Sequence, residues 1–78
     1  MSPSEYINAA RIRYAKKILD IHPDFPDDEL AFHCGFITAK SMRIHFVRHA
    51  GMDIDVYRSD ISTKINKVNE YGISDEKR

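Results

Sequence analysis

A glycine between two short apolar patterns constrains the fold of this chain more than any other feature. Apolar residues at helical spacing lie on both sides of Gly35: Leu30, Ala31 and Cys34 before it, and Met42, Phe46 and Val47 after it. Glycine adopts positive φ at little cost, so one helix can stop here and a second can start in a new direction. The stretch therefore predicts a helix-turn-helix over 27–50.

A long helix is predicted before this unit. Ser2, Pro3 and Glu5 have the spacing of a capping box with proline at the first helical position. Apolar residues then continue at helical spacing on one broad arc to Ile21, where a connector with two prolines ends the pattern. The arc is wider than a surface helix needs, so the helix over 2–21 is expected to have neighbours on more than one side.

A third helical pattern follows the unit. Thr38 is placed to cap the second helix of the unit and Gly51 to end it, while Asp53 can cap the next helix. The inward positions of that helix are predicted to be Ile54, Tyr57 and Ile61, and the pattern continues to about residue 70. The polar residues 71–78 are expected to be a disordered tail.

Length and composition indicate one small soluble domain. No apolar run approaches the roughly 20 residues of a membrane helix. The first residues lack the basic-then-apolar layout of a secretory signal, so a cytoplasmic location is expected. Cys34 is the single cysteine of the chain and is expected to be a small core residue, with no internal disulfide.

Charge is balanced over the chain but not along it. The chain has twelve lysines and arginines and twelve aspartates and glutamates, whereas nucleic-acid binders usually carry a basic surplus. The stretch 37–51 nevertheless has Lys40, Arg43 and Arg48 and no acid. The second helix of the predicted unit is therefore basic within a neutral chain, which permits DNA binding and lowers its expected affinity.

Several segments together resemble one family of regulators. They are Ser2-Pro3-Ser4-Glu5-Tyr6, Arg11-Ile12-Arg13-Tyr14-Ala15-Lys16-Lys17-Ile18-Leu19, Ala31-Phe32-His33-Cys34-Gly35-Phe36, Phe46, Arg48, Gly51 and Tyr57-Arg58. In this order and without a gap, they are similar to the C-terminal half of the DNA-binding domain of AraC-type transcriptional regulators. The resemblance covers about three quarters of the chain.

The resemblance implies an all-α, homeodomain-like fold. It would consist of a long joining helix over 2–21, a helix-turn-helix over 27–50 and a C-terminal helix over 53–70, together one half-domain over 1–70. In the family each unit places a recognition helix in the major groove, which here corresponds to about 38–50. The implied function is sequence-specific binding of double-stranded DNA as part of a bacterial transcriptional regulator, in the cytoplasm at the nucleoid.

Six residues are the predicted DNA contacts. If the helix docks as in the family, the base edges are within reach of Thr38, Lys40, Ser41 and Arg43, and the phosphates are within reach of His45 and Arg48. No cofactor, metal or small-molecule ligand is expected, because the i, i+4 pair His45 and His49 lacks further zinc ligands. No spacing suggests a nucleophile with its base or a phosphate loop, so an enzyme is not expected.

An alternative function follows from departures from the family pattern. The family usually has more cationic or polar residues at the positions of Ile44 and Val47, an aliphatic residue at Asp27 and a polar one at Phe32. With zero net charge, these residues favour a degenerate regulator remnant that acts as a protein–protein interaction or dimerisation module. The expected form of self-association is a homodimer through Phe32 and the apolar stripe over 61–68.

Overall fold

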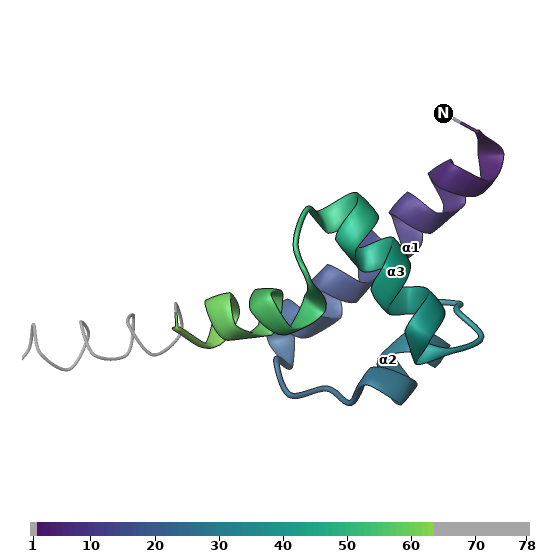
Figure 1. Ribbon diagram of the computed structural model, residues 1–78. Coiled ribbons are helices and arrows are strands. Elements are labelled where there is room, and N and C mark those ends of the chain that lie inside the picture. The colour runs from purple at the N-terminus through teal and green to yellow at the C-terminus, as the bar shows by residue number, and fades with distance from the viewer. Residues whose placement is uncertain (1, 64–78) are drawn as a thin grey trace, which may run out of the picture.

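The computed structural model describes residues 2–63, and every regular element among them is a helix (Figure 1). The helices are α1 (Pro3–Ile21), α2 (Asp27–His33) and α3 (Ala39–Ala50), followed by a helical segment over 54–63. The expected all-α class is thus confirmed for this part of the chain. The predicted continuation of the last helix to residue 70 and the predicted tail over 71–78 lie outside the described residues.

The boundaries of α1 follow from local chemistry. The Ser2 hydroxyl accepts a hydrogen bond from the Glu5 backbone N–H at 3.2 Å, and Pro3 occupies the first turn, as the sequence predicts. The helix ends at Ile21 because Pro23 disfavours helical backbone at His22, which has φ −131°. One side of α1 is fully buried, at Ile12, Ala15 and Leu19.

The turn after α2 closes by a Schellman motif. The Phe36 N–H donates to the Ala31 carbonyl at 2.8 Å, and the Gly35 N–H donates to the Phe32 carbonyl at 3.2 Å. Gly35 has φ +92°, and a Cβ at this position would lie 3.0 Å from the Nε of Arg11. The positive φ therefore favours glycine here, and a Cβ would in addition require the Arg11 side chain to shift.

The ends of α3 also match their predicted caps. The Thr38 hydroxyl accepts from the Ser41 N–H at 3.0 Å, and Gly51 ends the helix with φ +82°. Asp53 then starts the segment over 54–63, since its carboxylate accepts from the Asp55 N–H at 2.8 Å. Local capping thus determines where α3 begins and ends and where the segment over 54–63 begins.

One core holds the helices together. Figure 1 shows α3 lying across α1, with α2 near the start of α3, and each of these helices contacts the other two. The buried residues come from every helix and from the turn: Ile12, Ala15, Leu19, Leu30, Ala31, Cys34, Phe36, Met42, Phe46, Ile54 and Ile61. Cys34 is a core residue as predicted, and burial raises the pKa of its thiol to about 11. Its thiol therefore stays protonated at neutral pH.

Among residues 2–63, no helix is apolar over a long enough stretch to cross a bilayer.

Candidate nucleic-acid interface

The two sides of α3 differ completely in exposure. Met42 and Phe46 are fully buried on the inner side. The opposite side, here called the outer face of α3, is formed by four exposed residues: Lys40, Ile44, Val47 and Arg48. The spacings of three and four residues place them on one stripe of the helix, and α3 contains no acidic residue.

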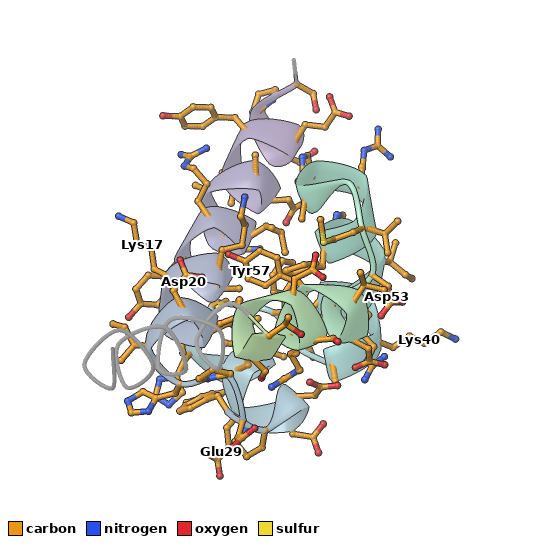
Figure 2. The ribbon with its side chains drawn as sticks, turned by 90° about the vertical axis from the view of Figure 1, so that its left-hand side faces the viewer. Lys17, Asp20, Glu29, Lys40, Asp53 and Tyr57 are labelled. Carbon is orange, nitrogen blue, oxygen red and sulfur yellow. The ribbon has the colours of Figure 1, made fainter. Side chains whose placement is uncertain are left out.

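Lys40 is an outer-face cation that extends into solvent. Figure 2 shows its side chain pointing away from the molecule at the start of α3. Within residues 2–63 it makes no ion pair at 4.0 Å or less, unlike the two arginines of the helix. Its ammonium group is therefore available to a ligand without the loss of an internal contact.

Arg43 lies at the border between the outer face and the core. Its guanidinium donates to the Asp27 carboxylate at the start of α2 and lies 3.6 Å from the Asp55 carboxylate. The hydrogen bond and the charge of Asp27 raise the pKa of Arg43 further above its already high value. The predicted base contact of Arg43 thus competes with two carboxylates of the same chain.

Asp27 connects three parts of the fold. Its second oxygen accepts from Arg58, whose other nitrogen donates to the Pro23 carbonyl at 2.5 Å. Desolvation raises the pKa of Asp27, but hydrogen bonds from both arginines outweigh it, so the pKa lies below its ordinary value. Asp27, one of the residues that depart from the family pattern, therefore joins α2, α3 and the segment over 54–63. The sequence interpretation missed this role.

Arg48 is paired with the first turn of α1. Its Nη2 donates to the Glu5 carboxylate at 2.5 Å, and this hydrogen bond, with the charge of Arg48, lowers the pKa of Glu5. The Arg48 side chain is 61% exposed, so water and salt screen the pair. Such a pair contributes little stability, and Arg48 can exchange Glu5 for another anion.

Thr38 and Ser41 belong to the N-terminal cap of α3. The Thr38 hydroxyl accepts the Ser41 backbone N–H, and Ser41 is half-buried. The two residues therefore have a structural role at the end of α3 nearest Lys40. The Ser41 hydroxyl is the group of this pair that the cap hydrogen bond does not use.

His45 does not belong to the outer face. Its ring stacks on Phe36, with centroids 5.6 Å apart, and on His49 at 6.3 Å. The Nδ1 atom of His45 and the Nε2 atom of His49 are buried without a hydrogen-bond partner. Within the described chain, no group of three or more potential ligands is placed to hold a metal ion. The predicted phosphate ligand His45 therefore packs against the turn.

Apolar side chains occupy the middle of the outer face. Ile44 is 59% exposed and Val47 48% exposed, between Lys40 and Arg48 along the helix. Exposed apolar residues are common, and these two are neighbours on one helical stripe. The outer face can thus contact an apolar group at its centre and anions at both ends.

Comparison of the chain with protein-family models gives no match, and comparisons with curated proteins and with solved structures give none either. The resemblance to AraC-type domains therefore rests on residues of this sequence alone.

Proposed function

We propose that this chain is an AraC-type, homeodomain-like helix-turn-helix module of a bacterial transcriptional regulator that binds double-stranded DNA. In this proposal α2 and α3 are the two helices of the unit, and α3 is the recognition helix. The single observation that carries the proposal is the outer face of α3, an exposed stripe without acid on a helix that both caps and core hold in place.

Residues of the outer face and two residues beside it, Ser41 and Arg43, have separate tasks in this proposal. Lys40 and Ser41, near the N-terminus of α3, contact base edges in the major groove. Ile44 contacts a thymine methyl group, and Arg48 exchanges Glu5 for a phosphate. Arg43 keeps its pairs with Asp27 and Asp55 and positions α3.

One unit with so few free cations is expected to bind DNA weakly. Non-specific complexes of this type have dissociation constants of about 10⁻⁴ to 10⁻⁶ M at physiological salt. Specific recognition would then need a second unit, as in other helix-turn-helix proteins that bind as dimers.

The test is a fluorescence anisotropy titration of mixed-sequence duplex DNA with the full chain at low and moderate salt. Lys40→Ala and Arg48→Ala should each weaken binding, and Arg48→Ala, which removes the phosphate contact, should also reduce the salt slope by about 1. Lys16→Ala is the matched control, because Lys16 is on α1 with its ammonium 5.9 Å from the Tyr57 ring centroid. Absence of binding at low salt, or equal affinity for all variants, would overturn the proposal.

A second candidate function is protein binding by the same face in a degenerate regulator remnant. The exposed Ile44 and Val47 favour it, because apolar residues at the centre of a contact surface are typical of protein interfaces. Ile44→Lys distinguishes the two functions. A cation at this position should strengthen DNA binding and should disrupt an apolar protein contact.

A further inference from the structure

The side of α1 that faces away from the core carries a second exposed apolar stripe. Its residues are separated alternately by three and four positions, here called the α1 seam: Ile7, Ala10, Tyr14, Lys17 and Ile21. This is the a/d spacing of a coiled coil over more than two heptads. Only one of the five residues is charged, and it lies near the end of the helix.

The described helices leave most of this seam exposed, although Ala10 is partly buried. Ile7 is 47% exposed, Tyr14 51% and Ile21 73%, while α2, α3 and the segment over 54–63 pack on the other sides of α1. The wide apolar arc that the sequence shows on this helix is thus only partly used by the described core. The rest of the arc has the pattern of a helix–helix contact.

We propose that two copies of this chain form a dimer by pairing their α1 seams in antiparallel orientation. This surface differs from the predicted one at Phe32 and 61–68. Phe32 is 79% exposed, but Ile61 is buried in the core of its own chain, and Ile65 and Val68 lie outside the described residues. The dimer does not depend on DNA binding by α3.

Charge complementarity selects the second copy as the occupant and sets its direction. Arg13 and Asp20 are both exposed and both flank the seam at the g position of the heptad; the Asp20 Oδ1 accepts a hydrogen bond from the Tyr57 hydroxyl at 2.8 Å, while its Oδ2 has no partner within residues 2–63. In an antiparallel pair g residues face g residues, so Arg13 of each copy lies opposite Asp20 of the other. A parallel pair would place Arg13 opposite the apolar Ile18, at position e. Two interchain ion pairs thus form only in the antiparallel arrangement.

The side chains of the seam also complement one another in that register. In this register, residue 21 of one copy lies opposite residue 10 of the other, and residue 17 lies opposite residue 14. The large Ile21 therefore lies over the small Ala10 of the other copy. Tyr14 meets Lys17, whose ammonium can lie over the ring. The same kind of contact already exists within the chain, where the Lys16 ammonium is 5.9 Å from the Tyr57 ring centroid. The dimer is two-fold symmetric, so the Ile21–Ala10 contact and the Tyr14–Lys17 contact each occur twice.

Pairing of the α1 seams costs little conformational entropy. α1 is already held as a helix by its cap and by Ile12, Ala15 and Leu19 in the core, so pairing has to order only exposed side chains. Figure 2 shows Lys17 of the seam and Lys40 of α3 extending from opposite sides of the molecule. A dimer through α1 therefore leaves the outer face of α3 accessible.

Sedimentation equilibrium of the full chain from about 1 to 500 μM tests the proposal. We expect a monomer–dimer equilibrium and a dissociation constant that rises about 100-fold in Tyr14→Glu, because each mutation acts twice and buries a charge. Val56→Glu is the matched control, since it makes the same kind of change at a similar exposure, 49%, outside the α1 seam. Circular dichroism would verify that both variants are folded.

Arg13→Glu tests the direction of pairing. It places like charges opposite each other and should weaken the dimer about 10-fold, and the double variant Arg13→Glu, Asp20→Arg should restore it. A cysteine pair, Ala10→Cys with Ile21→Cys, should form 10–21 crosslinks between copies on oxidation, as read by peptide mapping.

Three results would overturn the proposal. A monomer at all concentrations would mean that another occupant covers the seam or that none does. A dimer that is lost in Phe32→Glu but kept in Tyr14→Glu would assign the interface to α2. Crosslinks of 10 with 10 and 21 with 21 would show parallel pairing.

Discussion

The inner and outer sides of α3 have similar helical spacing but different constraints. Phe46 on the inner side is fully buried and its ring packs edge-on at 5.5 Å from Tyr57, whereas the neighbouring Val47 on the outer side is about half exposed. The inner side therefore determines where α3 lies, and the outer side can change without changing the fold.

The largest effect is expected at Phe46. Phe46→Ala should lower the free energy of unfolding by about 3–5 kcal/mol, because it leaves a cavity between α1 and α3. Val47→Ala should change it by less than about 0.5 kcal/mol. Urea denaturation followed by circular dichroism measures both. If Phe46→Ala leaves too little folded protein, Phe46→Leu should show a smaller loss of the same sign, and equal effects at 46 and 47 would contradict the division.

The next largest effect on stability is expected at Asp27, whose carboxylate pairs with the border residue Arg43. Asp27→Asn should cost about 1–2 kcal/mol of stability, because Arg43 and the largely buried Arg58 both lose their carboxylate partner. Asp28→Asn is the matched control, since Asp28 is an exposed neighbour on α2.

The stability of Asp27→Asn should also depend less on pH than that of the wild type. The folded pKa of Asp27 lies below its ordinary value of 3.8, so its contribution is present above about pH 4 and is lost as the pH falls through the folded pKa. Stability of the wild type should therefore decline below about pH 4, and Asp27→Asn should show a shallower decline. Glu5, whose pKa is also lowered, should account for part of the slope that remains. Parallel curves for the two proteins would contradict the role of Asp27.

The two glycines that precede and follow α3 should differ in their tolerance of alanine. Gly51→Ala should cost about 1 kcal/mol for its positive φ alone, since a Cβ there meets no atom within 4 Å. Gly35→Ala should cost more, because its Cβ would also displace Arg11 from the ring of Phe36. Thermal unfolding would rank the variants, and an equal loss at both sites would show that Arg11 moves freely.

The smallest effect is expected on the outer face itself. Glu5→Gln keeps the capping side chain of α1 but frees Arg48, so it should tighten DNA binding about twofold to fivefold at low salt. Combining it with Arg48→Ala should remove the gain. A gain that persists without Arg48 would show that Glu5 acts through the overall charge of the chain.

The sequence allowed the local boundaries of the helices to be predicted well. Ser2, Thr38, Gly35 and Gly51 act through contacts within a few residues, so their roles are visible in a single stretch of sequence. The inward positions Met42 and Phe46 were predicted for the same reason, because helical spacing separates the buried side from the exposed one.

The candidate site was harder to predict because its charges pair over long distances in sequence. Arg48 reaches Glu5, 43 residues away, and Arg43 reaches Asp27 across the turn. No local pattern marks such pairs, so both arginines were interpreted as free DNA contacts. His45 was assigned to phosphate binding for a similar reason, since its stacking on Phe36 depends on how the turn returns against α3.

The most direct test of DNA binding by the outer face of α3 is the salt dependence of affinity in Ile44→Lys. Ile44 lies between Lys40 and Arg48 and is 59% exposed, so lysine fits there without disturbing the core. If this face lies against DNA, the plot of log Kd against log salt should be steeper than that of the wild type by about 1, with tighter binding at low salt. An unchanged slope and affinity would contradict the proposed recognition role of α3.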